Sequence, residues 1–172
     1  NRYNNNIATS RITLPANAKL GSNEPSEAFV AKKNGTVVAY VLPSTAPKGY
    51  SGPITLLTGV YRDGSVAGVR VVSHQETPGL GDKIERKKSE WVLGFNDKKM
   101  GQPSLEDWAV QKDGGDFDQL TGATITPRAV VSAVRDTLLY FDEQKTTLQT
   151  LAAAASNAAP ANSSNQKNET EQ

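Results

Sequence analysis

Two turn sequences, each flanked by β-rich runs, constrain the fold of this chain most. Asn34-Gly35 supplies the two positive φ angles of a tight hairpin turn. Arg62-Asp63-Gly64-Ser65 is a second turn sequence between apolar runs. The four flanking runs that we predict to be strands are residues 29–32, 36–41, 54–61 and 66–73. Two successive hairpins predict an antiparallel sheet.

The strongest helix prediction covers Pro127–Phe141, where apolar residues recur at helical spacing. Thr126 is expected at the N-cap, and Pro127 fits the first helical position because its missing N–H costs nothing there. Together with the hairpins, this helix predicts an α+β fold, in which antiparallel β-hairpins form a sheet packed against helices.

The other segments carry weaker signals. Residues 1–27 are expected to be irregular or partly helical, and residues 43–53 form a loop with several prolines and glycines. The spacing of Ile84, Lys88, Trp91 and Phe95 predicts a helix over residues 84–95, and residues 108–112 suggest a short strand.

The domain is expected to cover residues 1–151. After Leu151 the sequence has almost no large apolar side chain. Such a segment buries too little surface to offset the entropy of ordering it. We therefore predict a disordered polar tail over residues 152–172.

The composition excludes several classes of protein. The 172 residues include 19 Lys and Arg against 18 Asp and Glu, a net charge of +1, which does not favour nucleic-acid binding. The absence of cysteine excludes disulfides and thiolate sites, and the single histidine, His74, argues against a histidine metal site. No apolar run approaches the roughly 18 residues of a membrane span. We predict no catalytic residue and no metal site.

The segment Thr121-Gly122-Ala123-Thr124-Ile125-Thr126 stands directly before the predicted helix. Free amides and the macrodipole at a helix N-terminus favour an anion, and a phosphate is the natural ligand. The alternative is an ordinary N-capped helix preceded by a turn.

This segment resembles the [S/T]-G-A-T-x-[T/S] signature of the covalent FMN-binding domain family. That family includes the RnfG (RsxG) subunit of Rnf electron-transport complexes and the NqrC subunit of the sodium-pumping NADH:quinone reductase. Residues 76–81, Glu-Thr-Pro-Gly-Leu-Gly, resemble a second motif of the family, and the similarity extends over residues 49–141 in a consistent order. The motifs are most similar to the RnfG branch.

The resemblance implies an FMN joined covalently by a phosphoester to Thr126, attached during maturation by a flavin transferase that uses FAD as donor. Glu76 could accept a hydrogen bond from the flavin or, equally, stabilise its own loop. The residues expected to bind the cofactor come from the two motifs and the first turn of the helix. They are Glu76, Thr77, Gly79, Leu80, Gly81, Thr121, Gly122, Ala123, Thr124, Ile125 and Arg128.

The resemblance also implies an electron-transfer subunit of a membrane-bound, ion-translocating oxidoreductase complex, with no independent substrate turnover. Its partners would be the other subunits of the Rnf complex. We expect a soluble domain facing the periplasm at the bacterial inner membrane, joined to an N-terminal transmembrane helix outside this sequence. The alternatives are an NqrC-like subunit and a non-redox anion-binding or interaction module.

Overall fold

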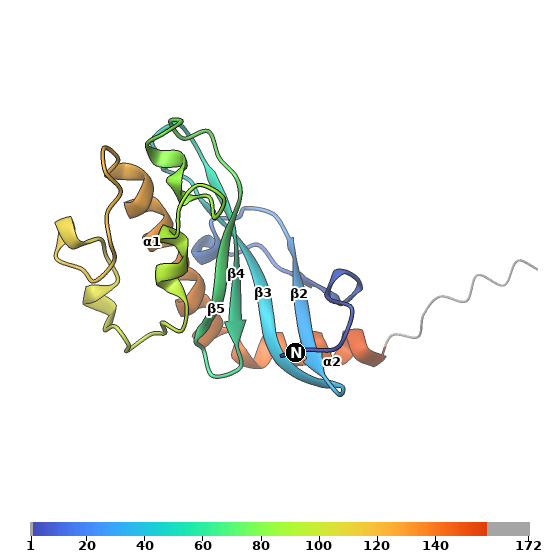
Figure 1. The fold of residues 1–172 in the computed structure, drawn as a ribbon. Coiled ribbons are helices and arrows are strands. Elements are labelled where there is room, and N and C mark those ends of the chain that lie inside the picture. The colour runs from blue at the N-terminus through green and yellow to red at the C-terminus, as the bar shows by residue number, and fades with distance from the viewer. Residues whose placement is uncertain (1, 158–172) are drawn as a thin grey trace, which may run out of the picture.

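A five-stranded antiparallel sheet forms the centre of the computed structural model, which describes residues 2–157 (Figure 1). The strands follow one another in space as they do in sequence, in the order β1-β2-β3-β4-β5. Their bounds are β1 Arg11–Leu14, β2 Ser26–Lys33, β3 Thr36–Ala46, β4 Ile54–Tyr61 and β5 Val66–Ser73. Each strand therefore pairs with its sequence neighbour, which is the simplest way for hairpins to build a sheet.

Both predicted hairpins are confirmed. Asn34 and Gly35 adopt φ angles of 52° and 81°, the left-handed values that the turn between β2 and β3 requires. Strands β4 and β5 have the predicted bounds and pair in antiparallel register. The turn residues and the β-rich runs on either side of them were sufficient to predict these two hairpins.

Two helices complete the α+β fold. Helix α1, Ile125–Glu143, packs against β3 and β4 and lies behind the sheet in Figure 1. The core between them includes Leu42, Leu56, Val134 and Leu138, all buried. The predicted class is therefore confirmed, although α1 begins two residues before Pro127.

Helix α2, Lys145–Asn157, continues the chain after α1 and packs against β1. Its buried residues Leu148 and Ala152 lie one turn apart on the same face. The helix thus extends beyond the domain boundary predicted at Leu151, and Ala152 is part of the buried core. The rest of the predicted tail, residues 158–172, lies outside the described residues.

Strand β1 and the end of β3 were not predicted, and β2 begins three residues earlier than predicted. In the N-terminal segment, Ile12 and Leu14 are buried on one face of β1, which is only four residues long and therefore gives a weak sequence pattern. Strand β3 extends through Pro43 to Ala46, into the segment expected to be a loop. Pro43 is in register with Leu57 of β4, whereas the pairing of β2 with β3 ends at Val41, so at Pro43 the strand β3 has a paired neighbour on one side only, where a proline is tolerated.

The expected helix over residues 84–95 is wrong. The segment forms two short 3-10 helices, η3 Gly81–Ile84 and η4 Trp91–Phe95. Between them, the Ser89 hydroxyl donates to the carbonyl of Lys83 at 2.6 Å and accepts from the amide of Trp91 at 3.1 Å. Side-chain bonds of this kind compete with a continuous helix.

The expected strand over residues 108–112 is also wrong, since only a single bridge joins Val110 to Phe117. Aromatic packing holds this region instead. The Phe117 ring lies 5.0 Å from that of Phe95 and 4.8 Å from that of Trp108. We call Trp91, Phe95, Trp108 and Phe117 the aromatic cluster.

Within residues 2–157, no helix is both long enough and apolar enough to span a bilayer.

Candidate functional site

Three segments that are distant in sequence meet around a cavity of about 330 Å³. They are the loop between β3 and β4, the loop after β5, and the turn that leads into α1. The residues that line the cavity are Tyr50, Thr77, Leu80, Gly81, Gly122, Ala123, Thr124, Ile125 and Thr126. The two motifs identified in the sequence thus form different parts of one cavity wall.

Glu76 joins the three segments from behind this wall. Its side chain is only 4% exposed. The carboxylate accepts hydrogen bonds from the amides of Tyr50 and Ser51, both at 2.8 Å, and from the Thr126 hydroxyl at 2.7 Å. Of the two roles left open by the sequence, the structure supports the loop-stabilising one.

Small residues allow the two motifs to approach. A Cβ atom on Gly81 would lie 2.7 Å from Thr126 Oγ1 and 3.1 Å from Glu76 Cβ. Gly122 has a φ of +77°, and a Cβ there would lie 2.7 Å from Leu80 Cδ2. Side chains at these glycines would therefore separate the loop after β5 from the start of α1.

The two candidate threonines occupy different positions at the start of α1. The structure corrects the predicted N-cap, because Thr124 is the N-cap residue and Thr126 lies inside the first turn. Thr126 lines the cavity although it is only 1% exposed, and its hydroxyl donates to Glu76. Thr124 is partly exposed on the cavity wall, and its side chain makes no capping hydrogen bond.

The start of α1 also presents backbone donors to the cavity. The first intrahelical bond runs from the Arg128 amide to the Thr124 carbonyl, so the amides of Ile125 and Thr126 have no acceptor within the helix. Pro127 has no amide hydrogen to leave unpaired. These donors, with the positive end of the helix dipole, favour a phosphate group at this point.

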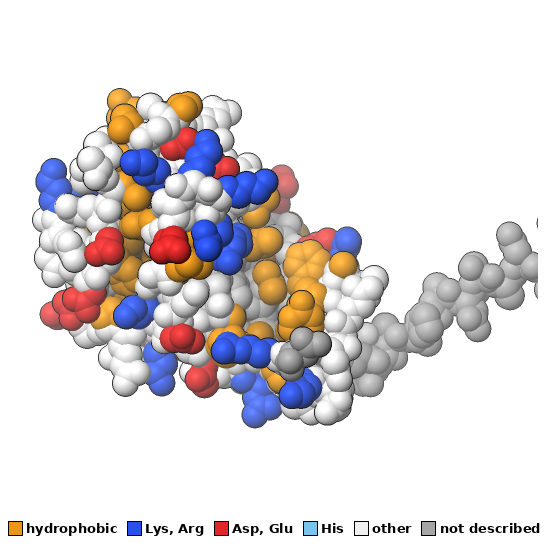
Figure 2. Space-filling view, in the orientation of Figure 1, with side chains coloured by type: hydrophobic (Ala, Val, Ile, Leu, Met, Phe, Trp, Pro, Cys, Tyr) orange, Lys and Arg blue, Asp and Glu red, His pale blue; other side chains and the backbone are white. Residues whose placement is uncertain are grey.

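The rim of the cavity exposes large apolar side chains. Tyr50 is 67% exposed, Leu80 40% and Ile125 44%. Figure 2 shows hydrophobic side chains at the upper end of the molecule, where the loops after β3 and β5 lie in Figure 1. An exposed apolar rim around polar backbone donors suits a ligand with a flat apolar part and an anionic part.

Tyr50 was not among the predicted site residues. The available signal was a large aromatic residue in a loop punctuated by Gly49 and Gly52, where no core pattern requires one.

Not every predicted site residue lines the cavity. Arg128 forms a bidentate ion pair with Asp113, with N–O distances of 2.7 and 2.8 Å. These hydrogen bonds lower the pKa of Asp113 and raise that of Arg128. Thr121 and Gly79 are exposed and do not line the cavity, although a φ of +77° at Gly79 lets the loop turn toward it.

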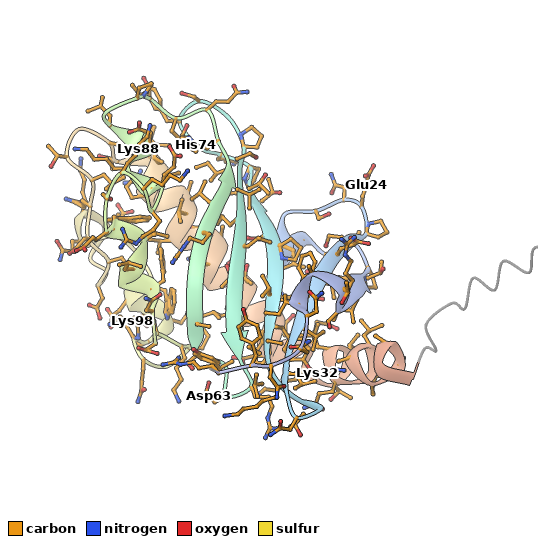
Figure 3. The ribbon with its side chains drawn as sticks, turned by 45° about the vertical axis from the view of Figure 1, so that its right-hand side comes forward. Glu24, Lys32, Asp63, His74, Lys88 and Lys98 are labelled. Carbon is orange, nitrogen blue, oxygen red and sulfur yellow. The ribbon has the colours of Figure 1, made fainter. Side chains whose placement is uncertain are left out.

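Polar side chains that do not line the cavity also hold the loop after β5, and Figure 3 shows His74 and Lys88 near each other. His74 Nδ1 accepts from the Glu76 amide at 2.9 Å, and Nε2 lies 3.1 Å from Glu85. Lys88 lies 2.6 Å from buried Asp82. The hydrogen bond from Lys88 lowers the pKa of Asp82, and that from His74 lowers the pKa of Glu85.

Among the described side chains, no group of three or more His, Cys, Asp and Glu residues is placed to hold a metal ion.

Comparison with known proteins agrees with this geometry. The profile of the FMN-binding domain family matches residues 49–139, which include all three segments of the cavity. The chain is 52% identical over 143 residues to the G subunit of the ion-translocating oxidoreductase complex of Pseudoalteromonas atlantica, covering 83% of this chain and 66% of that protein. It is 54% identical over 142 residues to the protein of the same name from Erwinia tasmaniensis, covering 81% of this chain and 66% of that protein. The chain thus spans about two thirds of the length of these relatives.

A solved structure supports the fold alone. The crystal structure of Shewanella oneidensis NqrC has a TM-score of 0.55 and 20% sequence identity, covering 86% of this chain and 70% of that chain. The identities to the two G subunits are much higher. The chain therefore belongs to the FMN-binding domain family, in the group that contains the G subunits of ion-translocating oxidoreductase complexes.

Proposed function

We propose that this chain is the flavin-carrying domain of such a G subunit and relays electrons through FMN within a membrane complex. The observation that carries the proposal is the cavity between the loop after β5 and the start of α1. It combines backbone donors for a phosphate with an apolar rim for a flat ring. When bound, FMN supplies the redox chemistry, while the protein supplies its position and electrostatic surroundings.

The residues on the cavity wall suit the two ends of FMN. The free amides of Ile125 and Thr126 would bind the phosphate. Tyr50 and Leu80 would contact the ring system, and Gly122 and Ala123 would let the backbone approach it closely. A volume of about 330 Å³ is in the range of small-molecule sites, and its exposed rim leaves one side of the ring accessible to a redox partner.

A covalent phosphoester to Thr126 is part of this proposal. Thr126 belongs to the cavity wall, and its hydroxyl has a carboxylate acceptor at 2.7 Å. Gly81 has no side chain to obstruct Thr126 Oγ1. Thr124 is the alternative attachment residue. It is more exposed on the same wall, and its hydroxyl is not used in a capping hydrogen bond.

The other residues predicted to bind the cofactor would contribute to the site in different ways. Thr77 and Gly81 belong to the wall, and Gly79 would shape its loop. Arg128 would act through Asp113, by fixing the segment before Thr121 relative to α1. Direct contact of Arg128 with the phosphate would require it to leave that ion pair.

The cellular setting follows from the relatives and is likewise a proposal. These relatives are named as parts of an ion-translocating oxidoreductase complex. We propose that the domain faces the periplasm at the inner membrane, contacts other Rnf subunits, and receives its FMN from a flavin transferase. An NqrC-like role is the alternative within the family.

Intact mass and peptide mapping test the attachment. The chain is co-expressed with an active flavin transferase, as wild type and as Thr124→Val and Thr126→Val. We expect one FMN on the wild type and on Thr124→Val, and none on Thr126→Val. The reverse pattern in the two variants would assign the bond to Thr124. An unmodified wild type, beside a flavinylated control protein, would instead support an anion-binding module without covalent flavin.

A further inference from the structure

A buried carboxyl group lies directly behind the cavity wall. Among the described residues, only two carboxylates are buried, Glu76 and Asp82. Lys88 neutralises Asp82 at 2.6 Å. Glu76 has no cationic partner in the described part of the chain, since its three hydrogen bonds come from two amides and one hydroxyl.

The three hydrogen bonds of Glu76 all use acceptor lone pairs of its carboxyl group. The amides of Tyr50 and Ser51 can only donate, and the Thr126 hydroxyl donates to Oε1 as well. Hydrogen bonds to an ionised carboxylate are charge-assisted and stronger than bonds between neutral groups. The cost of burying the ionised form is therefore offset by three fixed donors.

One of these donors is the hydroxyl that the proposed function esterifies. A threonine hydroxyl is a weak nucleophile, and an adjacent base within hydrogen-bond reach activates it by taking its proton. Glu76 Oε1 accepts from Thr126 Oγ1 at 2.7 Å, which is within the range that such a pair requires. Because the hydroxyl proton points at Glu76, the lone pairs of Oγ1 stay available to attack a group in the cavity.

The base is itself held in place by the rest of the site. The amides of Tyr50 and Ser51 each donate to one carboxylate oxygen of Glu76 at 2.8 Å. A nucleophile, a base and a third group that orients the base form the arrangement found in enzymes that activate a hydroxyl. Here the arrangement lies in the chain that would be modified.

We propose that Glu76 is the general base for the attachment of FMN to Thr126. This inference rests on the proposed covalent FMN site. As Thr126 Oγ1 forms its bond to the FMN phosphorus of FAD, the bond from that phosphorus to the bridging pyrophosphate oxygen breaks and AMP leaves with the bonding electrons. The hydroxyl proton moves to Glu76 Oε1, and no atom changes its oxidation state. The flavin transferase then has to supply the bound FAD, while the acceptor chain supplies the base.

The decisive variant is Glu76→Gln, which keeps the size of the side chain and one acceptor oxygen but removes the basic carboxylate. The purified full chain is incubated with flavin transferase and FAD, and the covalent product is followed by intact mass. We expect the maximal rate to fall about 100-fold, in the range that general bases contribute. An unchanged rate in Glu76→Gln, beside a normally modified wild type, would overturn the inference.

A base and a purely structural residue differ in which kinetic constant they change. Loss of the base should lower the maximal rate and leave the KM for the acceptor chain unchanged, because the transferase still recognises the same surface. A raised KM with an unchanged maximal rate would mean that Glu76 only positions the loops, and would overturn the inference.

A matched control removes a carboxylate elsewhere. Glu24 is exposed and lies on the side of the molecule away from His74 in Figure 3. Glu24→Gln should be modified at the wild-type rate. An equal loss of rate in Glu24→Gln and Glu76→Gln would overturn the assignment to the site.

A measurement on the wild type alone covers the case in which Glu76→Gln does not fold. If proton transfer to Glu76 accompanies bond formation, modification within a single turnover should be slower in D₂O than in H₂O. Equal rates in the two solvents would overturn the inference. A wild type that takes up no flavin, beside a modified control protein, contradicts the proposed function itself rather than the role of Glu76.

Discussion

The two irregular regions of this domain are held together in opposite ways. Around the cavity, loops are fixed by the hydrogen bonds of the buried Glu76 and approach one another closely at Gly81, while Tyr50 and Leu80 stay exposed. In the aromatic cluster, the side chains themselves hold the loops, and Trp108 and Phe95 are almost fully buried.

The difference shows how a loop can be fixed without using up its apolar side chains. Backbone amides that bind a carboxylate fix the path of the chain and leave the side chains free to contact a ligand. Stacked rings fix the path by contacting one another, so their surface is already buried. The first arrangement suits a binding site and the second suits a structural support.

The largest expected loss of stability comes from removing the largest fully buried ring of the aromatic cluster. Trp108→Ala should lower the free energy of unfolding by about 3–5 kcal/mol, because it removes a fully buried indole and leaves a cavity. Chemical denaturation would measure this change, and the FMN content of each folded molecule should not change.

Trp108→Phe is the matched control. It keeps a ring in the cluster and loses only part of the indole, including the N–H that donates to the Pro103 carbonyl at 3.1 Å. A destabilisation as large as that of Trp108→Ala would mean that this hydrogen bond, rather than ring packing, holds the region.

A smaller loss of stability is expected from a substitution where the two motifs approach each other. Gly81→Ala should cost about 1–3 kcal/mol, because its methyl group would press against Thr126 Oγ1 at 2.7 Å and force the loop to move. We also expect less covalent FMN at a fixed time of reaction with the transferase, measured by intact mass.

Gly94→Ala provides the comparison within the aromatic region. A Cβ there meets no atom within 4 Å, so both stability and FMN content should stay close to those of the wild type. If Gly81→Ala behaved in the same way, the contact between the motifs would not matter for the site.

A still smaller, pH-dependent effect is expected at the ion pair of Asp113 and Arg128, which is partly open to solvent. Hydrogen bonds from Arg128 lower the pKa of Asp113 in the folded state. The pair therefore stabilises the fold above the ordinary pKa of about 3.9, and this contribution is lost as the pH falls through the lowered pKa.

The measurement is the thermal midpoint of wild type and Asp113→Asn as a function of pH. The two curves should be separated by a constant gap at neutral pH and should converge in acid. Asp116→Asn, at an exposed aspartate that has no ion pair with any residue in the described part of the chain, should show no gap. A gap that widened in acid would contradict the sign of the predicted linkage.

The smallest effect on stability is expected at the exposed ring of the cavity rim. Tyr50→Ala should change the free energy of unfolding by less than about 0.5 kcal/mol, since 67% of the residue is exposed and its amide bond to Glu76 is retained. Flavin fluorescence should nevertheless become more accessible to iodide quenching. Tyr3→Ala, at an exposed tyrosine that does not line the cavity, should change neither quantity.

Sequence patterns determined the parts of the fold in which neighbours in sequence are neighbours in space. The hairpin turn at Asn34-Gly35 and the runs of β4 and β5 each carry their own signal, and the apolar stripe of α1 points to the sheet. The two motifs also indicated which segments form the site. Their recognition needed no knowledge of how the segments pack.

Only the tertiary structure decided how these segments act on one another. Ser89 and the ring contacts overrode the helical spacing of residues 84–95, because long-range packing outweighs weak local preference. The two threonines are a second example, since their spacing in the sequence does not reveal the hydrogen-bond partners of their hydroxyls. Glu76, fifty residues away in sequence, gives the Thr126 hydroxyl a buried acceptor, whereas Thr124 is the N-cap residue at the cavity. Hydrogen bonds between distant segments exist only after the chain has folded, so no local pattern could have distinguished the surroundings of the two hydroxyls.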